Sequence, residues 1–557
     1  FTLTPAAGGR STLRGRYTRP LAIIMGVVSS VLLIACANIA NLMLARASVR
    51  RRDLSVRLAL GASRARLARQ LLAETFMLAA LGTFGGFLVS QWCSAALVRQ
   101  LATPGYSPYL DLSTDWRVVV CVVGIAVVTA LLFGLTPALG VSAIAPSDAL
   151  KDQSRTLAGG TGQRLRNALV VAQVALSLTV IVSAGLFLRT FASLARTPLG
   201  FDPAQLLVAT VDLRQTAADA ASRAEMFHAL GDAVAATPGV SAMGISAITP
   251  ISGAGWNTRI SYAGREIPAS AGRAAMSWVN AVSADWFATY GMTIKSGRGF
   301  TSGDRVGAPA VTVVNEAFVQ QFFRDRNPVG DEIAAEYVTA PGVTRFRVIG
   351  VISNAIYRSA RAGMTPTMYV PLTQSGSVRS TMGFTIRTSM PFGALTRDLS
   401  ESLTRVAPGA ALTFLPMRDL VRGSVAQERL LAAFSGSFGA LALILAALGL
   451  YGVTSYSVSR RRAEIGIRMA LGADRATVVR LVMRRVLVLL AAGLAAGTVL
   501  AAWASQFVGT LLFGLDAHDV RTFAIGALVL LAVGWIAGWI PARRASRADP
   551  MFALRNP

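Results

Sequence analysis

Seven stretches of this chain are too long and too apolar to belong to a water-soluble domain. Each lacks a charged side chain over about 20 residues, the length that an α-helix needs to cross the roughly 30 Å hydrocarbon layer of a membrane. Lipid offers the backbone no hydrogen-bond partners, so we expect helices there and not strands. The predicted fold class is therefore a polytopic α-helical membrane protein with seven transmembrane helices. The stretches lie near residues 21–45, 75–98, 118–141, 167–188, 431–458, 486–511 and 522–542.

The charge of the chain is concentrated beside these stretches. In a soluble protein, the net charge of +26 would indicate a nucleic-acid partner. Basic and acidic residues are nearly balanced over 195–430, however, so the excess of arginine lies next to the apolar stretches. Arginine in short loops beside a span marks the cytoplasmic side of a membrane. We therefore expect the lipid bilayer as a partner, and no nucleic acid.

The same rule predicts the orientation of the loops. Seven alternating crossings satisfy it, with the C-terminus in the cytoplasm. The arginines among residues 1–20 are the exception, and we interpret this segment as the end of a further outer domain. The predicted cytoplasmic segments are 46–69, 142–166 and 460–485, and the predicted outer segments are 1–20, 99–117, 189–430 and 512–521.

Residues 195–430 have the pattern of a folded, water-soluble domain. Their apolar runs are short and alternating, and Gly, Pro, Asn and Asp separate them. Strands mixed with helices predict an extracytoplasmic α+β domain. Trp256, Trp278 and Trp286 fit packing in its core better than the wall of a ligand groove. Strands are predicted at 206–213, 240–246, 259–263, 276–282, 311–315, 346–352, 367–372, 383–388 and 411–416, and helices at 217–236, 316–324 and 391–406.

One basic passage occurs twice, 411 positions apart, and each copy lies between two apolar stretches. Residues 50–64 and 461–475 share an acidic residue, an arginine four positions later, a Leu-Gly-Ala sequence and a residue suited to cap a helix. A second match, at a shift of 404, relates residues 136–151 to 540–555. A repeat of this kind indicates a duplicated membrane unit.

Each copy predicts a short amphipathic helix, a sharp turn and a second helix that enters a span. The acid and the arginine are four residues apart and can pair on one helical face. Apolar residues four apart, as at Ile465 and Met469, form a stripe suited to the inner membrane surface. The glycine suits the end of the first helix and the next Ser or Asp the start of the second. Such an elbow can pass a push from the cytoplasm into the spans. The residues assigned to this coupling are Asp53, Arg57, Leu58, Gly61 and Ser63 in the first copy, and Glu464, Ile465, Arg468, Met469, Gly472 and Asp474 in the second.

Attraction of a plain basic helix to anionic lipid headgroups is a second interpretation of both passages. Headgroup attraction requires only charge, whereas the acid, the glycine, the cap and the apolar spacing all recur. That detail favours a protein-binding surface, and the lipid interpretation stays open as the alternative.

No motif for catalysis or nucleotide binding is present in the sequence. The phosphate-loop pattern GxxxxGK[ST] is absent, and the glycines at 159, 160 and 162 suit a flexible linker. The two histidines, His228 and His518, belong to no catalytic motif. Cys36, Cys93 and Cys121 all fall in predicted spans and match no metal-binding motif. We therefore expect no enzyme activity, no metal and no bound cofactor.

The second basic passage and the outer domain together resemble a known family. The sequence of residues 464–473, Glu-Ile-Gly-Ile-Arg-Met-Ala-Leu-Gly-Ala, looks like the cytoplasmic coupling helix of the MacB-like and FtsX-like ABC transporter permeases. The chain is most similar to their duplicated, acidobacterial-type "orphan" members. The outer-domain motifs that carry the resemblance are residues 297–300 with Asp304, and residues 313–316, 327–330, 348–351 and 369–371.

The resemblance implies a domain order and a set of partners. In the family, each unit is one span, a periplasmic domain and three further spans, so this chain is expected to lack the start of its first unit. It implies a multi-pass protein of the bacterial inner membrane that binds no ATP itself and partners a separate MacB-type cytoplasmic ATPase. A periplasmic adaptor or envelope protein is a further implied partner, and the implied role is efflux or envelope-related export. Asp53 in place of Glu, and Ser55 in place of Gly, depart from the family pattern in the first copy.

On this basis the chain divides into seven segments. An alternative function from another class is a non-transporting membrane sensor or scaffold, whose periplasmic domain binds a protein or peptide. The segments are the end of a first periplasmic domain (1–20), a first FtsX-like three-helix module (21–141), a cytoplasmic linker (142–166), a transmembrane helix (167–188), a MacB-type periplasmic core domain (189–430), a second FtsX-like three-helix module (431–542) and a cytoplasmic tail (543–557).

Overall fold

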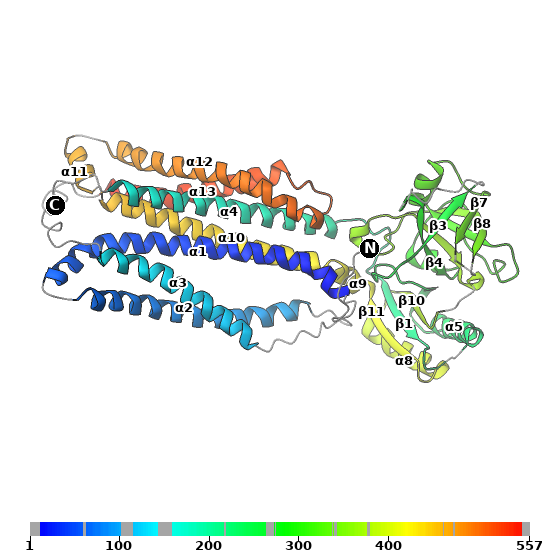
Figure 1. Cartoon of the computed structure of the whole chain (residues 1–557). Coiled ribbons are helices and arrows are strands. Elements are labelled where there is room, and N and C mark those ends of the chain that lie inside the picture. The colour runs from blue at the N-terminus through cyan, green and yellow to red at the C-terminus, as the bar shows by residue number, and fades with distance from the viewer. Residues whose placement is uncertain are drawn as a thin grey trace. The chain divides into compact units, whose positions relative to one another are not determined.

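The chain forms two compact units, one built of long helices and one an α+β unit made mainly of Leu194–Gln427. Figure 1 shows both in a computed structural model, and each is described by itself. The residues that the structure describes are 12–59, 63–101, 115–142, 159–216, 219–262, 272, 274–336, 338, 342–375, 379–460, 462–471 and 474–547.

All seven predicted spans lie within helices of the first unit. Six helices are long and apolar enough to cross a membrane, and the described apolar part of α3 is shorter, Trp116–Val128. The prediction of a polytopic helical protein with an α+β domain is therefore confirmed. The helices are α1 (Thr12–Ala59), α2 (Arg64–Leu101), α3 (Trp116–Ser142), α4 (Gly159–Ala195), α10 (Ala426–Arg460), α11 (Arg462–Ala470), α12 (Arg475–Val508) and α13 (Val520–Ala545).

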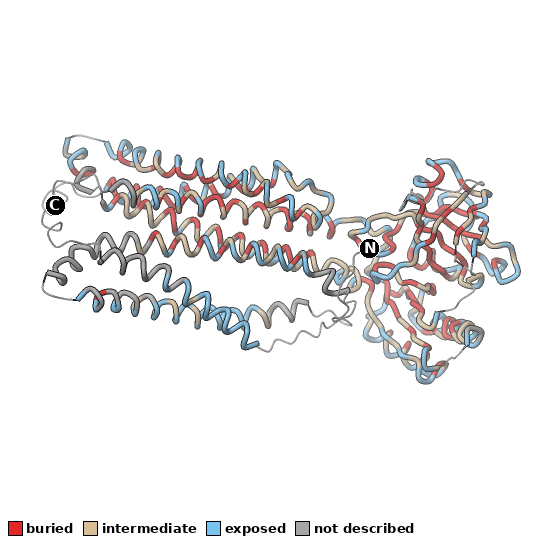
Figure 2. Tube along the Cα trace, in the orientation of Figure 1, coloured by how far each residue is buried: buried red, intermediate tan, exposed pale blue. Residues whose placement is uncertain are grey.

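Helix α4 lies at the centre of a bundle with α10, α12 and α13. It is buried over 61% of its apolar window, against 28–33% for the other three, and Figure 2 shows buried residues along its length. Small residues allow this close packing. A Cβ atom at Gly493 of α12 would lie 2.6 Å from the side chain of Val174, and one at Gly497 would lie 2.9 Å from Cα of Ala175.

The strands of the α+β unit form a single sheet. One part of this sheet closes on itself, and other strands extend it on one side. The strand order β4-β3-β7-β8-β6-β9 returns to β4 through a parallel β4–β9 pairing, so these six strands close on themselves. Strands β11, β1, β10 and β2 continue the sheet beyond β4. The strands are β1 (Leu206–Asp212), β2 (Val240–Ser246), β3 (Trp256–Tyr262), β4 (Met276–Val282), β5 (Ile294–Gly297), β6 (Val311–Asn315), β7 (Glu332–Glu336), β8 (Val343–Ile352), β9 (Thr367–Pro371), β10 (Thr381–Thr388) and β11 (Ala411–Pro416).

Two amphipathic helices cover the extension. Leu395, Leu399 and Leu403 of α8 are fully buried against β1 and β10, together with Phe227 of α5. Leucines at this spacing occupy one helical face, which explains why the helix forms against the sheet. The helices of this unit are α5 (Ala220–Ala235), α6 (Trp286–Tyr290), α7 (Glu316–Phe318), α8 (Phe392–Val406) and α9 (Met417–Ser424).

The predicted strands and helices of this unit are confirmed, with shifted ends. The helix predicted at 316–324 begins as the α-helical turn α7 and continues as a π-helical turn, Val319–Phe323. Strands β5 and β7 were not among the predicted strands. The sequence of β7, Glu-Ile-Ala-Ala-Glu, contains residues that favour helices, so only its pairing with β3 and β8 makes it a strand.

Candidate functional site

The second elbow consists of α11 and the start of α12. Helix α11 ends at Ala470, and the backbone N–H of Leu471 still donates to Ile467 O at 3.0 Å. Asp474 precedes α12 in an extended conformation, and its carbonyl accepts from Thr477 N at 3.0 Å. The predicted capping by the Asp474 side chain is wrong, because the carboxylate makes no cap hydrogen bond. Gly472 lies outside the described residues, as does the side chain of Glu464.

The two faces of α11 have different surroundings. Ile465 is 5% exposed and lines a cavity of about 50 Å³ with Val458 of α10 and Leu481 of α12. Ile467 is 48% exposed and Leu471 82% exposed. Arg468 is exposed beside them, while Met469 is half-buried. Ile465 therefore holds the helix against the bundle, and Ile467, Arg468 and Leu471 form its outer face.

Arg485 links the cavity under α11 to the centre of the bundle. It lines the same cavity, and it donates to Ser457 Oγ of α10 at 3.3 Å and to Asn167 Oδ1 of α4 at 3.2 Å. One residue away on both helices, the buried Arg166 of α4 stacks on the ring of Tyr456 of α10, with 4.3 Å between the guanidinium carbon and the ring centroid. Hydrogen bonds and ring stacking thus join α4, α10 and α12 at the end of the bundle next to α11.

The first elbow differs from the prediction of a separate short helix. Asp53, Arg57 and Leu58 belong to the last part of α1, which runs unbroken to Ala59. The reason is local, since residues 44–59 contain neither Gly nor Pro. Ser63 directly precedes α2, and its carbonyl accepts from Arg66 N at 3.0 Å. Gly61 and the side chains of Asp53, Arg57 and Leu58 lie outside the part of the chain that is described.

Polar side chains inside the spans join the first half of the chain to the second. Asn38 of α1 and Gln173 of α4 both donate to the carbonyl oxygen of Leu445 in α10, at 2.8 Å and 2.7 Å. A Cβ atom at Gly449 would lie 2.3 Å from Asn38 Oδ1 and 2.4 Å from Gln173 Oε1. None of these residues was among the predicted site residues. The signal was present, because an amide side chain in an apolar span is costly unless it bonds to another helix.

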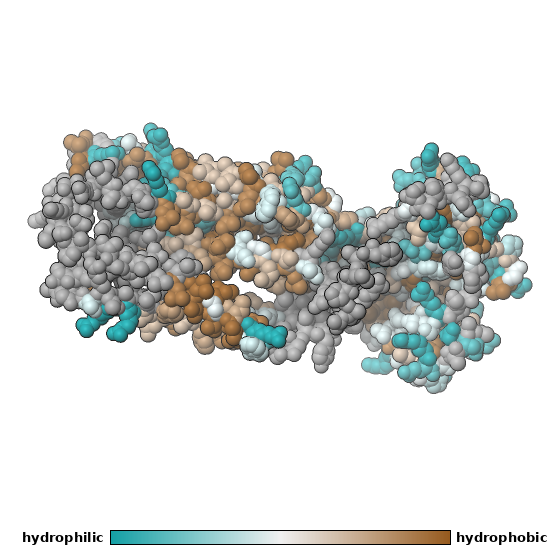
Figure 3. Space-filling view, in the orientation of Figure 1, coloured by the Kyte–Doolittle hydropathy of each residue, from teal (hydrophilic) through white to brown (hydrophobic). Residues whose placement is uncertain are grey.

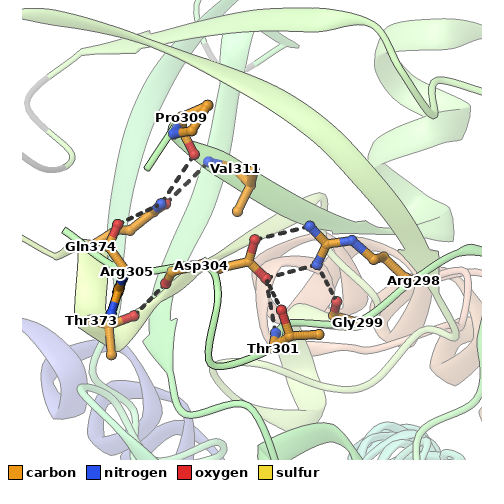
Figure 4. A network of polar contacts seen from close by, with 9 residues as sticks. All are labelled: Arg298, Gly299, Thr301, Asp304, Arg305, Pro309, Val311, Thr373 and Gln374. Atoms are coloured by element: carbon orange, nitrogen blue, oxygen red, sulfur yellow. Dashed lines mark hydrogen bonds and ion pairs between the residues drawn. The ribbon is translucent and has the colours of Figure 1, made fainter. Parts of the chain in front are cut away.

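Figure 4 shows a polar network around the outer-domain motif of residues 297–304. Arg298 donates to both oxygens of Asp304, at 2.7 Å and 2.9 Å, and Thr301 N donates to the same carboxylate at 2.8 Å. The bonds from Arg298 hold the pKa of Asp304 below its ordinary value. Thr373 Oγ1 donates to the backbone carbonyl of Asp304 at 2.6 Å. The carboxylate is thus fully bonded, and the network fastens a loop.

Two positions in the outer-domain motifs, Gly297 and Gly350, have no room for a side chain. Gly297 has φ +74°, and a Cβ atom on it would lie 2.2 Å from Ile349 O. A Cβ atom at Gly350 would lie 2.2 Å from Arg298 O. Strands β5 and β8 therefore approach each other closely only because both positions lack side chains.

The described residues contain no group of three His, Cys, Asp or Glu side chains placed to hold a metal ion. His228 is exposed on α5, and His518 Nδ1 lies 3.7 Å from Asp516 Oδ1. Trp286 is 1% exposed and packs on Tyr290 and Tyr369 in the core. Arg358 covers the ring of Trp278 at 5.0 Å.

Two family models match the chain over most of its length. The FtsX-like permease C-terminal family matches residues 25–146 and again 436–550. The MacB-like periplasmic core domain matches residues 168–412. The double match of the first family agrees with the repeat in the sequence, since both matches contain the basic passage and the Pro-Ala sequence at the end of the last span.

Among curated proteins, the chain is similar to ATP-binding/permease proteins. It is 26% identical over 285 residues to the macrolide export ATP-binding/permease protein MacB of Mannheimia succiniciproducens, covering 49% of this chain and 42% of that protein. It is 27% identical over 297 residues to the pyoverdine export ATP-binding/permease protein PvdT of Pseudomonas syringae, covering 50% and 43%. The chain thus spans less than half the length of these relatives.

A solved structure is also similar to part of the chain. The periplasmic region of MacB from Actinobacillus actinomycetemcomitans is 14% identical, with a TM-score of 0.28, and the match covers 39% of this chain and 91% of that structure. The family assignment rests on the two family models and the curated relatives. The chain belongs to the FtsX-like ABC transporter permeases that carry a MacB-like periplasmic core domain.

Proposed function

We propose that this chain is the permease subunit of a MacB/FtsX-type ABC transporter or mechanotransmission system. A separate cytoplasmic ATPase pushes on α11, and the push moves the spans and the periplasmic core domain. The membrane is the bacterial inner membrane, with α11 and the C-terminus in the cytoplasm. Cargo is exported, or work is done in the envelope, without catalysis by this chain.

The observation that supports this proposal best is the two-sided environment of α11. Ile467 and Leu471 are apolar and exposed, with Arg468 between them, and a patch of this kind is typical of the centre of a protein interface. On the opposite face, Ile465 is buried against α10 and α12. A helix that is held on one face and open on the other can receive a load and pass it on.

A path for that load leads from α11 into the bundle. Ile465 contacts the cavity between α10 and α12, and Arg485 on the wall of that cavity bonds to α4 and α10. Asn38 and Gln173 then connect α1 and α4 to α10 deeper in the spans. Coupling requires elements that move together, and these contacts supply the connection.

Co-purification with a MacB-type ATPase tests the proposal. The full chain, in detergent and with a non-hydrolysed ATP analogue, should retain the tagged ATPase. Each interface anchor is worth more than about 1 kcal/mol, so Ile467→Ala with Leu471→Ala should reduce recovery roughly tenfold or more. Arg468→Ala with Glu464→Ala should also weaken the complex. Arg547→Ala, which removes an exposed charge after α13, is the control.

Each result has a distinct meaning. Loss of the ATPase with both α11 double variants, and retention with Arg547→Ala, supports the coupling surface. Full recovery with both α11 variants overturns it and favours the sensor or scaffold alternative. If Arg468→Ala with Glu464→Ala lowers the affinity of the chain for anionic lipid while Ile467→Ala with Leu471→Ala keeps the ATPase, α11 binds headgroups and not a protein.

A further inference from the structure

A groove between α12 and α13 combines arginines with an apolar wall. Its volume is about 800 Å³. Val488, Trp535 and Trp539 on its wall are 61%, 48% and 40% exposed. An open apolar groove on helices that are long enough to span a membrane is accessible to lipid chains. It is lined by Arg475, Ala476, Val479, Arg480, Met483, Arg484, Leu487, Val488, Ala491, Trp535 and Trp539.

The charged and apolar residues of the groove are separated along its length. Arg475, Arg480 and Arg484 lie within about 14 Å of helix, at 1.5 Å per residue. Beyond Arg484, the lining residues of α12 are all apolar, ending at Ala491. Figure 3 shows hydrophilic residues at the end of α12 next to α11 and hydrophobic residues farther along the helix. A phospholipid has the same order, with a charged headgroup followed by apolar chains.

Helix α13 repeats this order on the other wall of the groove. Trp535 and Trp539 are four residues apart and share one face. The guanidinium of Arg543, one turn beyond, lies over the Trp539 ring with 4.9 Å to the centroid. Tryptophan concentrates at the membrane–water interface, at the level of the headgroups. Both helices therefore place the headgroup level at the same end of the groove.

We propose that this groove is a binding site for one anionic phospholipid of the leaflet next to α11. The planar guanidinium group of an arginine suits a phosphodiester, because it can donate two hydrogen bonds to the phosphate at once. Arginines line the groove, and no acidic residue among the described residues does. Asp474, directly before α12, carries a carboxylate but does not line the groove. The apolar wall beyond Arg484 accepts an acyl chain. The site uses α12 and α13, not the outer face of α11, so it is independent of the proposed ATPase contact.

The repeat provides a natural comparison, because only the second copy has the full set of residues. At the shift of 411, Arg475 and Arg480 correspond to Arg64 and Arg69, but Arg484 corresponds to Ala73. At the shift of 404, Trp535, Trp539 and Arg543 correspond to leucines at positions 131, 135 and 139. The first copy therefore keeps two of the arginines and lacks both tryptophans, so it should not form an equivalent site.

Quenching of tryptophan fluorescence by brominated lipid tests the site directly. The full chain is placed in phosphatidylcholine nanodiscs that contain a small fraction of either brominated phosphatidylglycerol or brominated phosphatidylcholine. The chain has 8 tryptophans, so the signal of the groove is the part that Trp535→Phe with Trp539→Phe removes. We expect that part to be quenched about threefold more strongly by the anionic lipid.

The matched variants are Arg475→Gln with Arg480→Gln, and Arg64→Gln with Arg69→Gln. Both remove two positive charges at equivalent positions of the repeat. The first pair should abolish the preference for phosphatidylglycerol, and the second should leave it intact. Arg475→Lys with Arg480→Lys keeps the charge and should retain most of the preference, which separates loss of the site from loss of the fold.

Three results would overturn the proposal. They are equal quenching by the two lipids in the unmodified chain, an unchanged preference in Arg475→Gln with Arg480→Gln, and an equal loss of preference in the Arg64 and Arg69 variant. The last result would mean that charge at the membrane surface, and not this groove, attracts the lipid. None of these readouts involves the ATPase, so this proposal and the coupling role can fail separately.

Discussion

Asn38 of α1 lies against Gly449 of α10, and Gly449 is the residue of the second copy of the repeat that corresponds to Asn38. The two are 411 positions apart, and a Cβ atom at Gly449 would lie 2.3 Å from Asn38 Oδ1. Val31 and Ala442, also 411 positions apart, share one buried cluster. Equivalent residues meet each other where two copies are related by a twofold axis. Helices α1 and α10 thus meet as a pair of like elements, and Asn38 fills the space that Gly449 leaves.

This packing predicts that Gly449→Ala destabilises the helical unit. The new methyl group would lie 2.3–2.5 Å from the amides of Asn38 and Gln173, which could move away only by giving up their bonds to Leu445 O. Overpacking of this kind costs about 1–3 kcal/mol. Thermal unfolding of the full chain in detergent should occur at a lower temperature than in the unmodified protein.

Gly436→Ala is the control for the Gly449 prediction. It is a glycine of the same helix, and a Cβ atom there would lie 3.8 Å from its nearest neighbour, Leu188. Its melting temperature should equal or slightly exceed that of the unmodified chain, since the methyl group meets only ordinary van der Waals contact and alanine favours a helix more than glycine does. Asn38→Ala should restore part of the stability of Gly449→Ala by making room. Equal melting of the two glycine variants would contradict the close approach of α1 and α10.

The sequence predicted the spans well and the helix contacts poorly, for physical reasons. A charge-free stretch of about 20 residues has few structural options, so all seven stretches are helices. In α11 and at the residue that follows it, by contrast, positions 465, 467, 469 and 471 are all apolar. Periodicity alone could not tell which of them is buried, and the stripe assigned to Ile465 and Met469 left out Ile467 and Leu471. Contact between Asn38 and Gly449 depends on how two distant helices pack, which a single sequence does not specify.

The lowered pKa of Asp304 predicts that the stability of the outer domain depends on pH. In the folded state this pKa is lowered from 3.8, chiefly by the bonds from Arg298. A lowered pKa stabilises the folded state above the unfolded value, and that stability is lost as the pH falls through the folded value. Asp304→Asn should therefore lower the melting temperature at pH 6, and the difference from the unmodified chain should shrink at a pH below 3.8.

Asp325→Asn is the comparison for Asp304→Asn. Asp325 is exposed and has φ +66°, a conformation that Asn also tolerates. Its melting temperature should stay near that of the unmodified chain at both pH values. A difference at Asp304 that persists undiminished at the lower pH would show that the ionised carboxylate is not what stabilises the loop.

Both elbows are predicted to lie on one side of the membrane, and labelling of single cysteines tests this. After replacement of Cys36, Cys93 and Cys121, Arg57→Cys and Arg468→Cys should react with a membrane-impermeant maleimide only in inverted vesicles. Arg305→Cys, in the outer domain, should react only in right-side-out vesicles. The reason is the concentration of arginine beside the spans at both elbows. Labelling of Arg57→Cys and Arg468→Cys from opposite sides would exclude a shared contact with a cytoplasmic ATPase.

Ile465→Ala should weaken the packing of α11 against the bundle without removing the surface of α11 that binds a partner. Ile465 is 5% exposed, and truncation of a buried isoleucine costs about 2–5 kcal/mol when the site cannot collapse. Here the cost should appear as loosening of α11, so amide hydrogen exchange across Arg462–Ala470 should become faster. The outer face, with Ile467 and Leu471, is unchanged, so recovery of the ATPase should fall by no more than about twofold. Ile467→Ala with Leu471→Ala should do the reverse, with normal exchange and little ATPase. If Ile465→Ala leaves exchange in α11 unchanged, the helix is not held by this side chain, and the load cannot enter the bundle through it.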